Sequence, residues 1–504
     1  MTATPATAIG EWRTSDEYAV RAARVPIVIG GLALVLALAY TAAIVKTDGQ
    51  MLLLVPLVAA LVGLAILAHP HVGVYLLFAV AILFEQWAIP GLEPITAQTR
   101  VFQNISTYTP IPLRLSLADL LMVLTLTSWA ARRLVGKLQP FRMGPLGWAV
   151  AAYGGVFVLG TVIGVARGGW NTDAALAEAR APFQMCLLYF LTANLIRDRQ
   201  QVMVLVWELV VLVGVKGLQG ILNYQEAAAA QADLSAVTGH EDVVFFDLTI
   251  VLLLVIGLLG LRTRLGYVLL ALLPLIAGAE LLTERRVGFI ALGAVAVAIT
   301  ILIFAENPRR GLVIAGVGAL LAGAYLVAFW DVAGPLGEPI RALRSAMNDS
   351  SLSVRDQLSD QWRVIENRNI AFTMRQLPLT GVGVGQAHLF HEQQVPVTFV
   401  YWRYITHNAL MWLWLKAGPI GAFVLWFLVA RVLLLGSALY LRLRDPVLRS
   451  IAVVPVALIF IQVIFSSVEL GLTYSRNMIV LGVALGLFSF LVEASARELA
   501  PKAA

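Results

Sequence analysis

Residues 311–330 have the sequence GLVIAGVGALLAGAYLVAFW, in which no side chain carries a charge. About 20 apolar residues form a helix long enough to cross the hydrocarbon core of a bilayer. The whole chain has this character: 60% of its 504 residues are hydrophobic and 13% are charged, and its mean hydropathy is +0.83. Soluble proteins carry about 25% charged residues. The composition therefore excludes a soluble enzyme, a nucleic-acid-binding protein and a disordered chain, and it predicts an all-α polytopic membrane protein.

Fourteen apolar runs are expected to form transmembrane helices: 25–45, 51–68, 72–89, 116–135, 145–166, 182–196, 201–222, 243–261, 265–283, 287–305, 311–330, 405–429, 450–470 and 476–494. Alternate loops are rich in Lys and Arg, which favour the cytoplasmic side. The alternation, and the net charge of +6, predict an even number of spans with both termini in the cytoplasm. A twelve-helix count, with two weak runs merged or re-entrant, also fits.

Residues 331–404 form a long polar segment between the eleventh and twelfth predicted spans, on the predicted outer face. Its stretch 353–376 places apolar residues at helical spacing between charged ones: Val354, Leu358, Trp362 and Ile365. This pattern predicts an amphipathic helix. Long loops in compact domains are often functional. Because no linker or repeat divides the sequence, we expect a single membrane domain, 1–504, with an outer lid.

Ionisable residues at membrane depth are functional candidates, because an unpaired charge in lipid is costly. Lys216 stands about two turns from the outer end of its predicted helix, where it has either a functional or a helix-pairing role. Most other candidates lie near predicted helix ends, where snorkelling explains them: Glu85, Asp119, Glu208, Glu280, Lys416 and Glu469. The single cysteine, Cys186, excludes an intrachain disulfide and a Cys-based metal site.

Two adjacent arginines, Arg285 and Arg286, occupy an outer helix junction, against the usual bias of basic residues. Something must compensate their charge, either the neighbouring Glu280 and Glu284 or an anionic ligand. Guanidinium groups match phosphate oxygens with two parallel hydrogen bonds. A diphosphate at the outer leaflet is therefore one ligand that this pair predicts.

His407 stands at the outer start of a predicted helix, at the foot of the long loop. Imidazole titrates near neutral pH and can take a proton from a hydroxyl, although a histidine at a helix start also serves structural roles. The sequence PLTGVGVG at 378–385 allows close backbone approach, but it lacks the Lys of a P-loop. The run 240–242, His-Glu-Asp, is a poor metal site because consecutive residues rarely bind one ion.

Together, and in this order, these elements resemble the O-antigen ligase and polymerase superfamily of bacterial envelope glycan enzymes over residues 281–425. The matching features are LLTERR at 281–286, similar to a Thr-x-Ser-Arg segment; the outer loop with its amphipathic helix; PLTGVGVG, similar to Pro-Leu-x-Gly-Val-Gly-x-Gly; and His407-Asn408 followed by Gly418 and Gly421, similar to His-Asn and Gly-x-x-Gly. The chain departs from the pattern at Glu284, where Gly is common, and at Arg285, where Ser is often found.

The resemblance implies a GT-C-like fold in the bacterial inner membrane, with no cofactor, no metal and an active site facing the periplasm. Family members transfer a glycan from undecaprenyl diphosphate to a hydroxyl: of lipid A-core or another surface acceptor in ligases, and of a second lipid-linked repeat in polymerases. By position, His407 would orient or deprotonate the acceptor and Arg286 would hold the diphosphate. The other substrate-binding candidates are Arg285, Lys216, Asn408, Arg355 and Gly383.

Two other classes have weaker support in the sequence. A transporter or flippase would show internal repeats and charged or broken helices near the membrane midplane, whereas most of the charged candidates gather at the outer rim. A metal-dependent GT-C sugar transferase would have an acidic first outer loop, and here residues 46–50 contain only Asp48. Ligases and polymerases share the motifs, and the His-Asn and arginine segments favour a ligase slightly.

Overall fold

The computed structural model describes residues 54–499 except 88, 90, 91, 93, 230–236, 261, 333 and 348–353, and within them it contains sixteen α-helices. The chain divides into two compact units, 1–68 and 69–504. The described part of the first unit is helix α2 (Leu54–Ala68). The predicted span 25–45 lies outside the described residues. Whether 1–504 forms one domain stays a prediction.

In the second unit, each predicted apolar run corresponds to one helix: α3 (His71–Leu83), α5 (Leu117–Leu134), α6 (Gly147–Ala166), α7 (Thr172–Leu195), α8 (Arg199–Ala229), α9 (Asp242–Leu258), α10 (Arg264–Leu282), α11 (Arg286–Glu306), α12 (Pro308–Phe329), α15 (Ala409–Arg442), α16 (Pro446–Ser466) and α17 (Ser475–Leu499). Short helices occupy connecting segments: α4 (Ile95–Gln98), η2 (Ile105–Thr107), η3 (Pro335–Gly337) and η5 (Gly471–Thr473). The prediction of an all-α protein is confirmed.

Of the described helices, eight are long and apolar enough to cross a membrane: α6, α8, α10, α11, α12, α15, α16 and α17. The protein is therefore a polytopic membrane protein, but the structure supports fewer complete spans than the fourteen predicted. The helices α3 and α9 have 13 and 17 residues, short of the about 20 that a bilayer requires. Helix α7 has enough residues, but its first half contains Asp173, Glu178 and Arg180.

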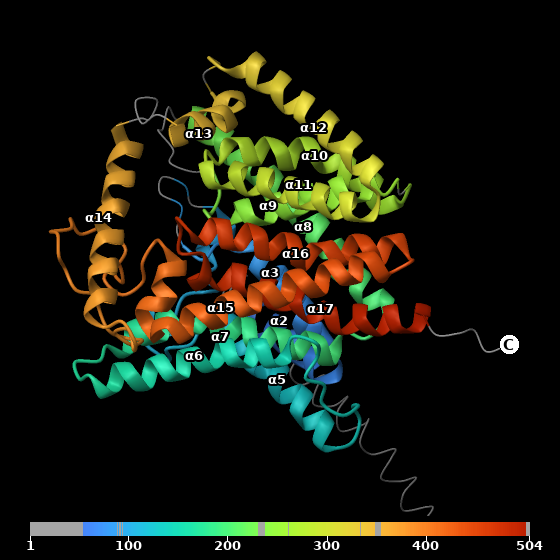
Figure 1. Cartoon of the computed structure of the whole chain (residues 1–504). Helices are drawn as coiled ribbons and strands as arrows, with labels where there is room; N and C mark the ends of the chain where they lie inside the picture. The colour runs from blue at the N-terminus through green and yellow to red at the C-terminus, as the bar shows by residue number, and fades with distance from the viewer. Residues whose placement is uncertain are drawn as a thin grey trace, which may run out of the picture. The chain divides into compact units, whose positions relative to one another are not determined.

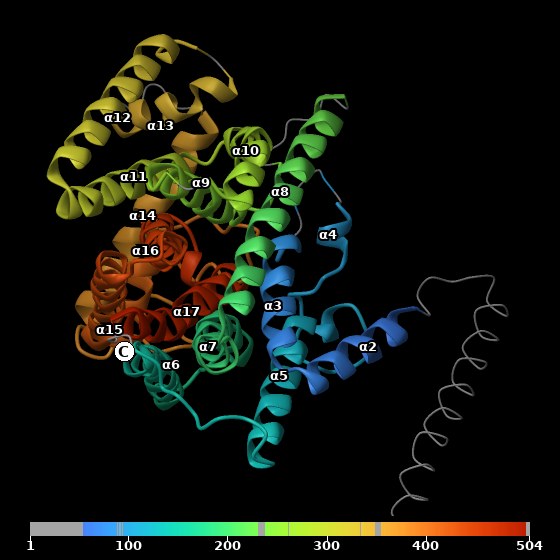
Figure 2. The same cartoon turned by 90° about the vertical axis from the view of Figure 1, so that its right-hand side faces the viewer.

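The long helices pack side by side, and α17 occupies the centre of the second unit. It lies along α7 and also contacts α3, α15 and α16, as the end-on view in Figure 2 shows. Its residues from Ser475 to Leu491 are all buried. Figure 1 shows that α14 (Val354–Gln376) stands across the direction of these helices at one end. The end that carries α14 also holds the loops predicted to face outward.

The loops predicted to face the cytoplasm are joined by ion pairs. Arg199 at the start of α8 lies 2.7 Å from Asp445, which precedes α16. Arg449 in α16 lies 2.5 Å from Glu306 at the end of α11. These contacts bring together the α7–α8, α11–α12 and α15–α16 connections, three of the loops predicted to face the cytoplasm.

Within the predicted outer loop 331–404, the structure contains α13 (Glu338–Met347) and α14. The prediction of a helix over 353–376 is confirmed by α14. The predicted apolar stripe is not its buried face, because Val354 and Leu358 are exposed. The buried side chains of α14 are in its second half and are mostly polar: Glu366, Asn369, Ile370 and Thr373. Polar side chains that a helix buries need hydrogen-bonding or charged partners. Glu366 is one of these side chains, and it belongs to the candidate active site.

Candidate active site

Charged side chains from four chain segments meet at the end of the helices that carries α14. They come from the start of α11, from α14, from the residue before the cap of α15, and from the segment after α16. We call this set the open cluster: Arg285, Arg286, Asp360, Arg363, Glu366, His407 and Glu469.

His407 is held by a buried carboxylate. Its Nδ1 lies 3.3 Å from Oε1 of Glu366, and its backbone N–H donates to Oε2 of the same group at 3.0 Å. The Glu366 side chain is 1% exposed, whereas that of His407 is 20% exposed. Because a carboxylate accepts hydrogen bonds, this contact assigns the proton of a neutral ring to Nδ1 and the lone pair to Nε2. The ring therefore has the orientation and tautomer of a general base.

Local structure fixes the position of His407 as well. Asn408 is the N-cap of α15, and its side chain accepts from the backbone N–H of Met411 at 3.1 Å. Such a cap satisfies a helix donor that would otherwise lack a partner. The ring of Trp362 meets the His407 ring edge-on with 5.0 Å between centroids. Asn408, predicted to bind substrate, serves in the structure to anchor the start of α15.

The arginines of the open cluster pair with carboxylates from other segments. Both terminal nitrogens of Arg286 lie 3.1–3.2 Å from the Asp360 carboxylate. Arg363 lies 3.1 Å from Glu469, and Arg285 lies 3.9 Å from the same carboxylate. These partners differ from Glu280 and Glu284, which the sequence offered. Glu284 is exposed at a φ of 53°, and Glu280 is buried in α10.

Burial and the charges of the open cluster shift the pKa values of Glu469 and His240. Burial opposes ionisation of Glu469, but the charges of Arg363 and Arg285 outweigh it and lower the pKa of that carboxyl. His240, in the segment before α9, is also near. Burial and then Arg285 lower the pKa of His240 to about 3, although Glu469 acts in the opposite direction. His240 is therefore neutral at neutral pH, and Glu469 is ionised.

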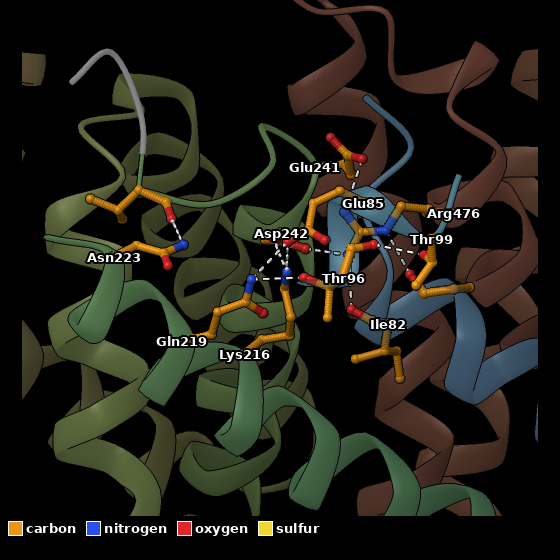
Figure 3. A network of polar contacts seen from close by, with 12 residues as sticks. Ile82, Glu85, Thr96, Thr99, Lys216, Gln219, Asn223, Glu241, Asp242 and Arg476 are labelled. Carbon is orange, nitrogen blue, oxygen red and sulfur yellow. Dashed lines mark hydrogen bonds and ion pairs between the residues drawn. The ribbon is translucent and has the colours of Figure 1, made fainter. Parts of the chain in front are cut away.

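Lys216 lies in a second set of charges (Figure 3), which we call the closed cluster: Glu85, Lys216, Glu241, Asp242 and Arg476. The side chain of Lys216 is 1% exposed, contacts Glu85 and lies 3.3 Å from Asp242. Arg476 is fully buried and lies 2.9 Å from Glu241. The structure thus pairs Lys216 with Glu85, just after α3, and with Asp242 of α9, which supports the helix-pairing alternative for this residue.

The three residues of the run 240–242, which the sequence made a weak metal-site candidate, have different surroundings in the structure. Glu241 and Asp242 are partners of Arg476, and His240 is near the open cluster. Among the described residues, no group of three or more His, Cys, Asp or Glu side chains is arranged to hold a metal ion.

The glycine motifs fasten the outer loop to the helices. Gly383 has a φ of 97°, and a side chain there would overlap the backbone of Gly160 and Gly164 in α6. The N–H of Val384 donates to the Gly160 carbonyl at 2.8 Å. Such a close approach requires glycine. Gly383, a predicted substrate-binding residue, is therefore constrained by packing.

The second glycine motif forms the other side of this contact. Gly418 breaks α15 at a φ of 65° and lies against the backbone at Leu379. Beside the break, the Lys416 ammonium lies 2.7 Å from Glu178 and 2.5 Å from the Gln386 carbonyl. Lys416 and Glu178 are both buried. The sequence suggested snorkelling for Lys416, but an internal ion pair holds it.

Sequence analysis missed several members of the open cluster. Asp360, Arg363 and Glu366 lie within the predicted amphipathic helix, and Glu366 follows Trp362 by four residues, on the same helix face. That spacing was the available signal. Glu469 was recognised as a charged residue near a span end but was attributed to snorkelling. Arg355, also predicted to bind substrate, is the second residue of α14, but its side chain lies outside the described part of the chain.

The fold and the open cluster define a class: a polytopic membrane protein with a histidine–carboxylate pair and paired arginines gathered at one end of its helices. Residues 271–427 match the O-antigen ligase family, so the chain carries an O-antigen ligase domain. The matched stretch contains α11, α14, His407 and both glycine motifs, and it confirms the predicted resemblance. A comparison with curated proteins gave no match.

Proposed function

We propose that the protein is an O-antigen-ligase-like glycosyltransferase of the bacterial inner membrane. It moves a glycan from undecaprenyl diphosphate to an acceptor hydroxyl at the outer face. The observation that carries this proposal is the meeting of His407–Glu366 with Arg285 and Arg286 in one partly exposed cluster, inside the stretch that matches the O-antigen ligase family.

His407 acts on the acceptor in this proposal. Its Nε2 takes the proton of the acceptor hydroxyl while that oxygen bonds to the anomeric carbon of the donor. The bond from this carbon to the phosphate oxygen breaks, and the electron pair leaves with the lipid diphosphate. Glu366, 3.3 Å from Nδ1, keeps the ring oriented and stabilises its positive charge, as the carboxylate does in a catalytic triad.

Arg286 acts on the leaving group. In the described structure its guanidinium is paired with Asp360, and both side chains are partly exposed, at 25% and 39%. A partly exposed pair keeps part of its hydration, so replacing Asp360 by the diphosphate costs less than replacing a buried partner. Arg286, with Arg285 beside it, then stabilises the charge that develops on the diphosphate. Because the charge is supplied by side chains, the step uses no metal ion.

Two further features belong to the proposal. Attack from the face opposite the diphosphate inverts the anomeric centre, so the product has the inverted configuration. The open cluster faces the periplasm and the basic loops face the cytoplasm, with both termini inside and twelve to fourteen spans in a GT-C-like arrangement. The exposed apolar side chains of α10, α11 and α12 suit a lipid environment.

The test is a reaction with the purified full chain in lipid nanodiscs. The substrates are an oligosaccharide linked to undecaprenyl diphosphate and, separately, lipid A-core or a second lipid-linked repeat. Glycan transferred to lipid A-core, with inverted configuration, is the expected result. Elongation of the lipid-linked repeat instead would identify a polymerase. Movement of the donor across a vesicle membrane with no transfer to either acceptor would overturn the proposal in favour of a flippase.

A further inference from the structure

A cavity of about 450 Å³ opens beside the open cluster. Its wall combines the segment after α3, the start of α7, the residues before His407 and the segment after Glu469. This volume lies within the about 300–1,000 Å³ of small-molecule sites. The proposed transfer step, which uses His407, Glu366 and the arginines, assigns no function to this cavity.

One wall of the cavity is aromatic. Trp87, Phe399 and Tyr401 follow one another edge to face, with 6.0 Å between successive ring centroids. Phe102 and Tyr474 add two more rings to the lining. Trp87 is 47% exposed, so its face is accessible. An exposed aromatic face offers a large apolar surface with little loss of side-chain freedom on binding. The C–H face of a pyranose ring fits such a surface.

Another part of the lining is polar, and its charges are paired. Arg114 lies 3.0 Å from Asp173, and Arg180 lies 3.2 Å from Asp119. Arg180 also donates to the side chain of Asn104. Each arginine thus has a carboxylate partner, and the remaining donors and acceptors suit hydroxyl groups. Rings on one part of the lining and neutralised polar groups on another match an uncharged sugar.

The cavity reaches the residues assigned to the chemistry. Ile405 and Leu470 line it, and they lie two residues before His407 and one residue after Glu469. Two residues of chain span at most about 7 Å. A sugar in the cavity can therefore present a hydroxyl toward His407. The arginines that would hold the diphosphate belong to α11, which contributes no residue to the described lining.

We infer that this cavity binds the terminal sugars of the acceptor glycan, as neutral pyranose rings stacked on Trp87, Phe399 and Tyr401. The inference rests on the proposed function and adds the place where the acceptor is selected. Much of the lining, including Trp87, Arg114 and Arg180, lies outside the stretch that matches the O-antigen ligase family. The chemistry would then belong to the matched domain, and acceptor choice to the residues around it.

The experiment measures binding and turnover in the full chain in nanodiscs. Binding is followed by saturation-transfer NMR with neutral oligosaccharides that differ in their terminal hexose, and with an oligosaccharide that ends in an acidic sugar. Three variants are compared with the unmodified protein: Trp87→Ala, Trp87→Phe as the conservative change, and Trp148→Ala as the control. Trp148 is 80% exposed at the start of α6 and does not line the cavity.

The expected result has two parts. Saturation reaches the ring C–H protons of at least one oligosaccharide, and Trp87→Ala abolishes it whereas Trp87→Phe and Trp148→Ala retain it. In turnover, Trp87→Ala raises the KM for the acceptor at least tenfold, leaves the KM for the donor unchanged, and changes kcat less than threefold.

Three results would overturn the inference. One is saturation that Trp87→Ala leaves unchanged, or that no oligosaccharide receives. Another is preference for acidic sugars, which contradicts a neutral site. The third is a rise in donor KM in place of acceptor KM, which assigns the cavity to the donor glycan. Any of these can occur with normal transfer, so they are distinct from failure of the proposed function, in which the unmodified protein transfers no glycan.

Discussion

The open and closed clusters both consist of basic side chains paired with carboxylates, but they differ in their exposure to solvent. In the closed cluster, the paired side chains of Lys216 and Arg476 and their acidic partners are 0–2% exposed. In the open cluster, the side chains of Arg286, Asp360 and His407 are 20–39% exposed. The comparison separates charges that hold helices together from charges that a substrate can reach.

The energetic reason lies in desolvation. A charge buried away from water costs several kcal/mol, which its partners offset only while all of them stay in place. The closed cluster therefore cannot exchange a carboxylate for a ligand without a large penalty. A partly exposed pair keeps much of its hydration, so Arg286 can leave Asp360 for a diphosphate. Buried cations thus mark the scaffold here, whereas the cations of the candidate site are partly exposed, although two of their carboxylate partners, Glu366 and Glu469, are buried.

The largest effect is expected when Lys216, a cation of the closed cluster, is replaced by an apolar residue. Lys216→Met leaves Glu85 and Asp242 buried without that cation, which should cost about 3–5 kcal/mol of stability. We expect a marked fall in the thermal unfolding midpoint in detergent and a lower yield of monodisperse protein. The control is Lys137→Met, which changes an exposed lysine. A stable Lys216→Met protein that loses donor binding would instead place Lys216 in the active site.

Arg286→Lys tests the open cluster, where we expect donor affinity to change and stability to stay the same. Lysine keeps the charge but loses the planar fork that contacts two oxygens at once. Donor affinity should fall about tenfold to a hundredfold, equivalent to about 1.4–2.8 kcal/mol, with an unchanged unfolding midpoint. Titration with the lipid-linked donor measures this, and Arg309→Lys at the opposite helix end is the control. Full affinity in Arg286→Lys would argue against a two-oxygen contact.

The titration of His240 tests the comparison further, because the arginines of the open cluster act electrostatically on this residue. Its pKa is lowered from 6.5 to about 3 by burial and Arg285. Between these values the unfolded chain binds a proton that the folded chain does not, so stability is full above pH 6.5 and is lost as pH falls toward 3. Glu469, whose pKa is also lowered, acts with the same sign.

His240→Gln should therefore reduce the acid-induced fall of the unfolding midpoint over that window. His391→Gln, at an exposed histidine, should leave the profile of the unmodified protein. Identical pH profiles for all three proteins would show that His240 titrates normally and is not under the influence of the arginines.

The smallest effect is expected at Glu284, beside the open cluster. Its φ of 53° is in the left-handed region, which costs a side-chain-bearing residue about 1–2 kcal/mol and glycine little. Glu284→Gly should raise stability by about 0.5–1 kcal/mol after the entropy of glycine is included. Glu226→Gly within α8 should lower it by a similar amount, and chemical denaturation measures both. A destabilised Glu284→Gly would mean that the glutamate makes a compensating contact.

This backbone angle also shows what the sequence could predict. Glu284 stands where the family pattern commonly has Gly, and the structure gives the reason: the chain turns through a positive φ just before α11. Apolar runs predicted the described helices because spans of about 20 apolar residues need little tertiary information. Helix ends were less predictable, since α7 begins among charged residues and α15 continues to Arg442.

The site was predicted unevenly for a physical reason. His407 and Arg286 stand in local motifs, so the sequence identified them as candidates. Their partners Glu366 and Asp360 are far along the chain and are brought near by the packing of α14. Lys216 was grouped with the arginines because its sequence position suggested an outer location, but its carboxylate partners come from other parts of the chain, the segment after α3 and the start of α9. Pairing between distant segments is what sequence patterns do not contain.

The most direct test of the account is the turnover of purified His407→Ala with lipid-linked donor and acceptor. A general base contributes about a hundredfold to ten-thousandfold to rate. The account predicts a loss of kcat in this range, with donor affinity and the unfolding midpoint unchanged because His407 is 20% exposed and Glu366 keeps its hydrogen bond from the backbone N–H of residue 407. Turnover close to that of the unmodified protein would contradict the assignment of the open cluster as the active site.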